Sequence, residues 1–165
     1  MNIFVVNPSF DKNMTDQFII ETATPLDYPR LSAIWESSVR ATHDFITDED
    51  FEHYKRHLVS YFEAVNLFIA KTIEGESVGF IGIAGSSIEQ LFVDACFRGM
   101  GVGTLLLQFA IKEHGADHVD VNEQNRQAVG FYLHSGFVTH SCSEVDSEGK
   151  PYPLLHLHYS GEVIP

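Results

Sequence analysis

The sequence predicts an α/β fold, with one mixed β-sheet and helices packed on its faces. Three observations support this class. Short β-branched runs alternate with helical patterns, three consecutive strand patterns separated by glycine-bearing turns occupy the middle of the chain, and a glycine-rich junction joins a strand directly to an apolar helix. The predicted order of elements is β α α β β β α β α β β.

The first strand and the first helix are predicted between residues 18 and 40. The run FIIETAT (18–24) is short and β-branched, and a proline follows it. In the segment over residues 26–40, Leu31, Ile34 and Trp35 recur at helical spacing. We therefore expect a strand that leads into a helix.

A second helix is predicted to begin after Thr47. Three acidic residues follow this threonine, and a hydroxyl cap with an acidic first turn satisfies the unpaired amides at a helix start. The apolar face that follows consists of Phe51, Tyr54, Leu58 and Phe62. We expect this helix to finish near Ala64.

The remaining pattern predicts six further strands and two helices. Their ranges are strands over 66–73, 78–85 and 87–94, a helix over 104–113, a strand over 118–122, a helix over 125–136, and strands over 137–145 and 152–160. The first three strands form an antiparallel meander, because short glycine-bearing turns join them. The turn DSEGKP joins the last two strands as a hairpin.

The length of 165 residues is typical of a single domain and is sufficient to bury a core without disulfide or metal staples. Residues 1–16 have no clear periodicity, so we expect them to form an N-terminal arm or extension. Residues 17–165 are predicted to form the one folded domain. No internal repeat interrupts them.

The charge balance narrows the classes of partner. The chain holds 10 Lys and Arg residues against 23 Asp and Glu residues, which gives a formal net charge of -13. Such a field repels phosphate backbones and anionic lipid, so neither a nucleic-acid partner nor a membrane partner is expected. The same field can attract a cationic substrate, or it can serve solubility alone.

The cysteine and histidine patterns indicate neither a disulfide framework nor a metal site. The chain has two cysteines and no C-x-x-C spacing, and the pairs His53/His57 and His156/His158 complete no metal-binding motif. The N-terminal stretch lacks the features of a signal peptide, and no run approaches ~18 apolar residues. A cytoplasmic protein is therefore expected, as a monomer or a homodimer.

The glycine-rich junction RGMGVGT (98–104) predicts an anion site. Helix starts expose unpaired amides at the positive end of the helix dipole, and glycines let a phosphate approach the backbone closely. A nucleotide P-loop is excluded because no lysine follows Gly103, and a dinucleotide fingerprint is excluded because Thr104 stands where glycine is required. A tight turn without a ligand is the remaining alternative.

This junction resembles the pyrophosphate-binding turn of the GCN5-related N-acetyltransferases (GNAT). Arg98, Gly101 and Gly103 fill the R-x-x-G-x-G pattern of that family, and they follow a strand of the type LFVD. A second segment, NEQNRQAVGFYLHSGF (122–137), is similar to the family pattern N-x-x-A-x-x-F-Y-x-x-x-G-F. The residues that fill this pattern in register are Asn125, Ala128, Phe131, Tyr132, Gly136 and Phe137.

The resemblance covers about residues 18–159. Segments 34–46 and 144–157 also resemble the YjaB-type acetyltransferases, a bacterial branch of the family. The resemblance implies the GNAT fold, in which the mixed sheet splays apart. It further implies an N-acetyltransferase that moves an acetyl group from acetyl-CoA to a primary amine by direct attack in a ternary complex.

The resemblance leaves two questions open. The acceptor is either an amine of a peptide or protein or a small-molecule amine. The alternatives to an enzyme are a non-catalytic acyl-CoA sensor and a dimeric interaction protein whose glycines are structural. Loop 40–47 and the hairpin over 146–152 are expected to select the acceptor.

The resemblance also implies a cofactor site in two parts. The pyrophosphate lies against the backbone amides of residues 98–104, and the pantetheine arm pairs with the exposed edge of the strand over 91–93. Asn122 and Asn125 lie near this arm, and Asn125 can also cap its helix. The implied cofactor-binding residues are Leu91, Phe92, Val93, Arg98, Gly99, Met100, Gly101, Val102, Gly103, Thr104, Asn122 and Asn125.

Tyr132 is the candidate general acid. A departing CoA thiolate needs a proton, and a phenol with a pKa near ~10 can supply it. Phe131 is expected to face the core instead. The acceptor amine must also lose a proton, for which the candidate bases are Asp120, Glu89 and His43. Asn122, on the same strand face as Asp120, is the fifth candidate catalytic residue.

Overall fold

The computed structural model describes residues 17–161, and the predicted arm over residues 1–16 lies outside them. The elements are β1 (Phe18–Thr22), a 3-10 turn η1 (Pro25–Asp27), α1 (Tyr28–Thr42), α2 (Asp48–Arg56), α3 (Leu58–Glu63), β2 (Asn66–Thr72), β3 (Ser77–Ala84), β4 (Ser87–Val93), a 3-10 turn η2 (Ala95–Phe97), α4 (Val102–His114), β5 (His118–Asn122), α5 (Arg126–His134), β6 (Phe137–Ser143) and β7 (Leu154–Tyr159). Apart from the two 3-10 turns, this order matches the prediction with one exception.

The exception is the second predicted helix, which is interrupted at His57 and forms α2 and α3. Nδ1 of His57 donates to the carbonyl oxygen of His53 at 2.7 Å, the oxygen that the backbone N–H of His57 would bond in a continuous helix. That N–H bonds the carbonyl oxygen of Tyr54 instead. Leu58 and Phe62 are buried, so the apolar face continues past the interruption.

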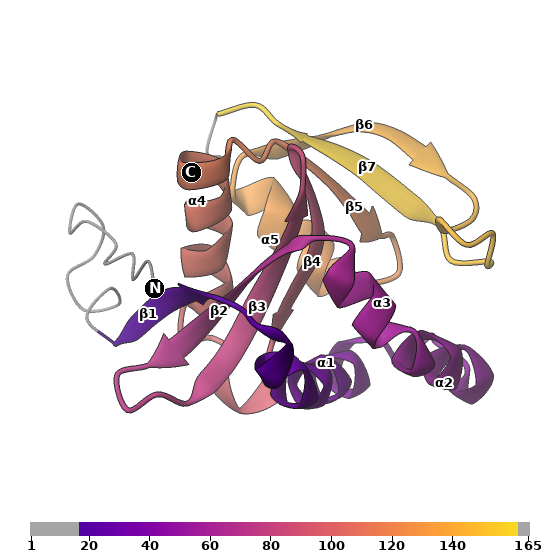
Figure 1. Ribbon diagram of the computed structural model, residues 1–165. Helices are drawn as coiled ribbons and strands as arrows, with labels where there is room; N and C mark the ends of the chain where they lie inside the picture. The colour runs from indigo at the N-terminus through magenta and orange to yellow at the C-terminus, as the bar shows by residue number, and fades with distance from the viewer. Residues whose placement is uncertain (1–16, 162–165) are drawn as a thin grey trace.

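The described residues form a seven-stranded sheet in the order β1-β2-β3-β4-β5-β7-β6 (Figure 1). All neighbours are antiparallel except β4 and β5, which run parallel. These two strands pair at Ser87 with His118 and at Ile88 with Val119, whereas β4 stays paired with β3 as far as Val93. The described parts of β4 and β5 therefore diverge after Ile88, and the sheet opens between them.

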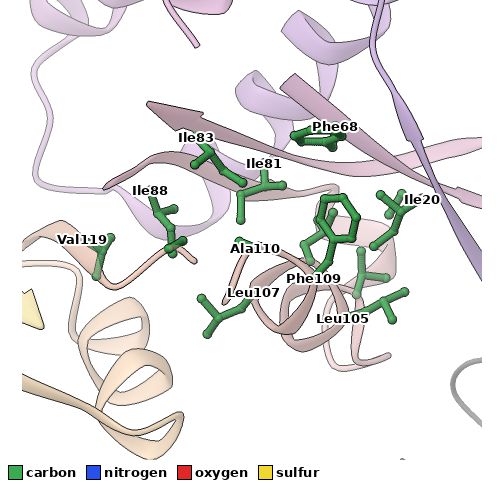
Figure 2. Packing of buried hydrophobic residues seen from close by; sticks show 14 of the residues in the cluster. Ile20, Phe68, Ile81, Ile83, Ile88, Leu105, Leu107, Phe109, Ala110 and Val119 are labelled. Atoms are coloured by element: carbon green, nitrogen blue, oxygen red, sulfur yellow. The ribbon is translucent and has the colours of Figure 1, made fainter. Parts of the chain in front are cut away.

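Helices cover both faces of this sheet (Figure 1). Alternation along β2 places Phe68 in the core on the α4 and α5 side and Ile69 in the core on the α1, α2 and α3 side. The ring of Phe68 packs edge-on against Phe109 of α4, with 4.9 Å between centroids (Figure 2). Burying each such ring contributes about 1.5–3 kcal/mol, so the helices on both faces stabilise the sheet.

The end of β4 is anchored by the buried carboxylate of Asp94. Arg30 of α1 donates to it at 2.9 Å, and the backbone N–H of Cys96 also donates at 2.9 Å. Burial alone would raise the pKa of Asp94, but the bonds from Cys96 and Arg30 outweigh it and lower that pKa. A charged Asp94 thus fixes α1 to the chain just before the glycine-rich turn.

None of the helices within residues 17–161 is both long and apolar enough to cross a membrane.

Candidate active site

The opening between β4 and β5 leads into a cavity of about 380 Å³, called the first cavity below. Its walls are β4 from Ile88 to Val93, the glycine-rich turn, β5 from Val119 to Asn122, and one face of α5. Because no strand within residues 17–161 pairs with β4 on this side beyond Ile88, its backbone groups there are available to an extended, amide-bearing ligand.

The glycine-rich turn forms one end of the first cavity. Gly99 and Gly101 have φ angles of 77° and 84°, in the region that favours glycine, and Gly101 immediately precedes α4. The first bond of α4 runs from the N–H of Leu105 to the carbonyl oxygen of Gly101. The N–H groups of residues 102–104 precede it, so the turn presents donors and the positive helix end to the cavity.

Of the twelve residues predicted to bind the cofactor, only Met100 is absent from the wall of the first cavity. Met100 is 42% exposed and lies between two glycines with positive φ. Arg98 lines the cavity and donates to Oε1 of Gln127 in α5. The guanidinium therefore ties the turn to α5 across the cavity mouth.

A second cavity, of about 550 Å³, lies on the other side of the opening. Its walls come from α1, α2, α3, β4, β5 and the chain between β6 and β7. Six residues line both cavities, namely His43, Glu89, Gln90, Phe92, Asp120 and Asn122. These six mark a junction where a ligand in one cavity can meet a ligand in the other.

The hairpin over 146–152 closes the second cavity by contacts with distant helices. The hydroxyl of Tyr54 donates to Asp146 at 2.5 Å, and the hydroxyl of Tyr61 donates to Glu148 at 3.1 Å. Burial and the Asp146 carboxylate raise the pKa of Tyr54, and burial together with Glu148 raises the pKa of Tyr61 to about 12. Both phenols therefore remain protonated donors at neutral pH.

The two segments expected to select the acceptor meet at this cavity. The backbone N–H of Thr47 donates to the hydroxyl of Tyr152 at 3.4 Å, and the ring of Phe45 lies 6.2 Å from that of Tyr152. Loop 40–47 and the hairpin thus form one rim.

The second cavity is lined by carboxylates and by no Lys or Arg among the described residues. The carboxylates are Glu89, Asp120, Asp146 and Glu148. Tyr54, Tyr61 and Trp35 add aromatic walls. A site of this kind attracts a cation with an apolar stem, since the carboxylates compensate the charge and the rings contact the methylenes.

Tyr132 lines the first cavity and is 6% exposed. Burial raises its pKa above the ordinary value, so the phenol stays protonated and can act as a proton donor. The expectation that Phe131 packs against the core is confirmed, but the expectation that it does so in place of Tyr132 is wrong. Tyr132 is buried and packs on Phe137, while Phe131 is partly buried against the same core and lies beside Gly103.

His43 follows the last residue of α1 and lies at the junction. Its Nδ1 is 2.7 Å from Oγ1 of Thr42, and its Nε2 is 3.4 Å from Nδ2 of Asn125. Burial lowers the pKa of His43 to about 4, although the nearby Asp44 opposes this effect. The imidazole is therefore neutral at pH 7 and a weak base.

The two asparagines predicted near the cofactor arm hold the start of α5. Oδ1 of Asn125 accepts from the N–H of Ala128 and so caps the helix, as expected. Oδ1 of Asn122 accepts from the N–H of Gln124. Both side chains also line the first cavity.

All five residues predicted for catalysis line the first cavity, and four of them, His43, Glu89, Asp120 and Asn122, lie at the junction. The sequence pattern missed Gln90, whose Nε2 donates to the carbonyl oxygen of Tyr61 at 2.9 Å and whose buried Oε1 accepts no hydrogen bond from the part of the chain that the structure describes. The available signal for Gln90 was a polar residue in a strand pattern between the apolar residues Ile88 and Leu91.

Among the described residues, Asp117, His118 and His158 bring three possible metal ligands within 4.8 Å, outside both cavities.

Residues 31–152 match the family model described as an acetyltransferase (GNAT) domain. The chain is 42% identical over 130 residues to the peptidyl-lysine N-acetyltransferase YjaB of Salmonella typhimurium, covering 79% of this chain and 90% of that protein. The solution structure of apo YjaB from Escherichia coli superposes with a TM-score of 0.82 at 39% identity, over 88% of this chain and 99% of that one.

A more distant likeness is to the PaiA N-acetyltransferase of Thermoplasma acidophilum, solved in complex with coenzyme A. Its TM-score is 0.64 at 19% identity, over 86% of this chain and 99% of that one, which shows a shared fold.

Proposed function

Since the chain belongs to the GNAT family of N-acetyltransferases, we propose that it transfers acetyl from acetyl-CoA to the side-chain amine of a lysine in a peptide or protein. The observation that supports this most directly is the pair of cavities that meet at the opened sheet. One cavity fits the donor, the other fits the acceptor, and the shared residues surround the point of transfer.

The first cavity fits two chemically different parts of acetyl-CoA, the charged pyrophosphate and the amide-bearing pantetheine arm. The donors and positive helix end at residues 102–104 suit the pyrophosphate. The backbone edge of β4 over Glu89–Val93 suits the amides of the pantetheine arm. This arrangement directs the thioester along β4 toward the junction.

The second cavity supports a lysine side chain as the acceptor. The four methylenes of lysine can contact Trp35, Tyr54 and Tyr61, while its ammonium faces the carboxylates Glu89 and Asp120 at the junction. The peptidyl-lysine activity named for the YjaB relatives supports the same choice. A polyamine has similar chemistry and is the competing acceptor.

Transfer needs a base for the ammonium and an acid for the leaving thiolate. Tyr132 is the proposed acid, because burial keeps its phenol protonated. For the base, the carboxylates Glu89 and Asp120 are favoured over His43, because their negative charge can hold the ammonium at the junction. His43 is neutral at pH 7, and its contacts with Thr42 and Asn125 suit a positioning role. The freed amine then attacks the thioester carbonyl, the C–S bond breaks, and the thiolate takes a proton from Tyr132. The nitrogen loses its second proton as the amide forms, and this proton restores the phenol of Tyr132.

Two further expectations accompany this proposal. Cys96 and Cys142 are free and exposed, which supports a reducing, cytoplasmic location. We also expect the protein to be a monomer or a homodimer.

The test combines acetyl-CoA binding by calorimetry with an acceptor panel monitored for free thiol. We expect acetyl-CoA to bind and thiol to be released with a lysine peptide faster than with a polyamine at equal concentration. Binding without thiol release for any amine would indicate a sensor. Absence of binding would indicate that the glycines are structural.

A further inference from the structure

Two histidines face each other across the outer strands of the sheet. His118 of β5 is the register partner of His158 in β7, and the centroids of their imidazole rings are 4.7 Å apart. Partners in an antiparallel pair lie on one face of the sheet. Oδ1 of Asp117, the residue before β5, contacts Nδ1 of His118. Each of the three side chains therefore offers one possible ligand atom, and these atoms lie within 4.8 Å of one another.

The backbone holds this group at the closed end of the sheet opening, where β4 and β5 still pair. The N–H groups of Asp117 and His118 donate to the carbonyl oxygen of Ser86, at 2.8 Å and 3.2 Å. The N–H of Tyr159 in β7 donates to the carbonyl oxygen of Asp117 at 2.8 Å. The backbone of the group is thus fixed by the fold, which lowers the entropy cost of binding a ligand there.

The group is separate from the site proposed for acetyl transfer. None of its three residues lines either cavity. The side chains of His118 and Asp117 are 56% and 40% exposed, so an ion can reach them from solvent.

Two imidazoles and one carboxylate form a ligand set that suits a transition metal ion. Imidazole nitrogen suits zinc, copper, nickel and iron, whereas Mg²⁺ and Ca²⁺ prefer oxygen ligands. Zn²⁺ has no geometric preference from its d electrons, and it is commonly held by three protein ligands with water in the fourth position. The group supplies the three protein ligands that such a site needs.

We propose that Asp117, His118 and His158 bind one Zn²⁺ ion. This inference goes beyond the acetyl transfer and does not depend on it. The ion joins β5 to β7 at the closed end of the opening, and its role is to stabilise the sheet at that point.

Binding replaces the hydrogen bond between Asp117 and His118. An ionised carboxylate can only accept, so Nδ1 of His118 carries the proton in that bond. The ion takes either the free Nε2 or Nδ1 after this proton has moved to Nε2. In both cases the imidazole stays neutral and keeps one proton. Tetrahedral bonds of about 2.0–2.2 Å separate the ligand atoms by roughly 3.3–3.6 Å, a spacing that exposed side chains reach by rotation.

Spacing along the chain did not indicate this group. The expectation of no metal site considered histidines within one helix or strand, such as His53 with His57. His118 and His158 meet only through the register of two strands. Within residues 17–161, no other group of three His, Cys, Asp or Glu side chains brings its ligand atoms this close.

The test is calorimetric titration of the untagged, chelator-treated protein with zinc chloride. We expect one Zn²⁺ per chain with a dissociation constant below about 100 μM. Asp117→Asn, His118→Ala and His158→Ala should each weaken zinc binding at least about tenfold. Magnesium chloride should give no binding. Acetyl-CoA affinity equal to that of the wild type should show that each variant is folded.

His53→Ala is the matched control. His53 and His57 form a second close histidine pair, with ring centroids 4.5 Å apart, and Oε1 of Glu148 lies 3.2 Å from Nε2 of His53. The zinc affinity of this variant should equal that of the wild type. Zinc should also raise the midpoint temperature of thermal unfolding for the wild type and His53→Ala, and not for His118→Ala, because an ion bound only by the folded chain stabilises it.

A measurement on the wild type alone complements the variants. In NMR spectra, the imidazole resonances of His118 and His158 should shift as zinc is added, while those of His53 and His57 stay unchanged.

Three results would overturn the site: no zinc binding to the wild type, equal zinc affinity in the wild type and His118→Ala, or a loss of affinity in His53→Ala. The first two would leave Asp117 and His118 as a hydrogen-bonded pair, and the third would assign the ion to the other histidine pair. A protein that binds zinc as expected but acetylates no amine would contradict the proposed function alone.

Discussion

Nζ of Lys150, in the hairpin between β6 and β7, lies 2.8 Å from Oδ1 of Asp50 in the first turn of α2. The hydroxyl of Tyr152 donates to the other oxygen of the same carboxylate. These two bonds join segments 100 residues apart and close the second cavity. The bond from Lys150, followed by that from Tyr152, lowers the pKa of Asp50 from 3.8 to about 2.

This ion pair predicts a specific acid sensitivity. Because the folded-state pKa of Asp50 is lower than the unfolded value of 3.8, its contribution to stability is complete above that pH and is lost as the pH falls toward about 2. Between neutral pH and pH ~3, the midpoint temperature of thermal unfolding should therefore fall further for the wild type than for Asp50→Asn. Glu49→Gln, an exposed carboxylate in the same turn, is the control and should behave as the wild type.

Asp50→Asn should also raise the KM for the peptide acceptor at neutral pH, because the rim loses its anchor, and should leave acetyl-CoA affinity unchanged. An unaltered KM with a lowered thermal midpoint would show that the hairpin contributes to stability and not to acceptor binding.

Tyr132→Phe removes one hydroxyl and almost no volume, so folding and acetyl-CoA binding should survive. Loss of a general acid should lower kcat by roughly 100-fold to 10,000-fold. The deficit should shrink with a thioester whose thiolate leaves more readily. Steady-state kinetics with both donors measure this, and a kcat near that of the wild type would make Tyr132 a packing residue.

Gly103 offers a cleaner test of the pyrophosphate site than Gly101, whose φ of 84° would strain any substituted residue. A β-carbon at Gly103 would meet Phe131 and Val93 at ordinary contact distances. Gly103→Glu places a negative charge at the positive helix end, while Gly103→Gln has the same size without the charge. Calorimetry should show acetyl-CoA binding at least about tenfold weaker for the glutamate variant, or ~1.4 kcal/mol. Equal affinities would argue against an anion at this position.

Local sequence signals predicted most helices and strands, because residues that cap or end an element interact with neighbours only a few positions away in the sequence. Thr47 caps α2 through its hydroxyl, which accepts from the N–H of Asp50, and Gly101 precedes α4. The break at His57 escaped prediction since a side chain competes there with a backbone bond, and no glycine or proline marks it.

The candidate site was predictable only where a motif spans it. The glycine-rich turn and the segment over 122–137 indicated the first cavity. The second cavity depends on pairs distant in sequence, such as Lys150 with Asp50 and Tyr54 with Asp146, which no local pattern encodes. The partner of Asp120 in β7 likewise follows from strand register, which the sequence order alone does not determine.

Salt should separate the two interpretations of the net charge of -13. If the field attracts a basic acceptor, KM for a lysine peptide with basic flanking residues should rise as the Debye length shortens from ~10 Å at 0.1 M to ~3 Å at 1 M salt. A peptide with uncharged flanks should respond less. An equal response of both peptides would leave solubility as the role of the charge.

The most direct test of the central claim is mass spectrometry of one lysine peptide with a capped N-terminus after incubation with the wild-type protein and acetyl-CoA. Its matched control is the same peptide with norleucine in place of lysine, which keeps the stem and removes the amine. The account predicts that the lysine peptide gains one acetyl group on the side-chain nitrogen in step with thiol release, and that the norleucine peptide gains none. Thiol release at the same rate with both peptides, or a lysine peptide of unchanged mass, would contradict acetyl transfer to lysine.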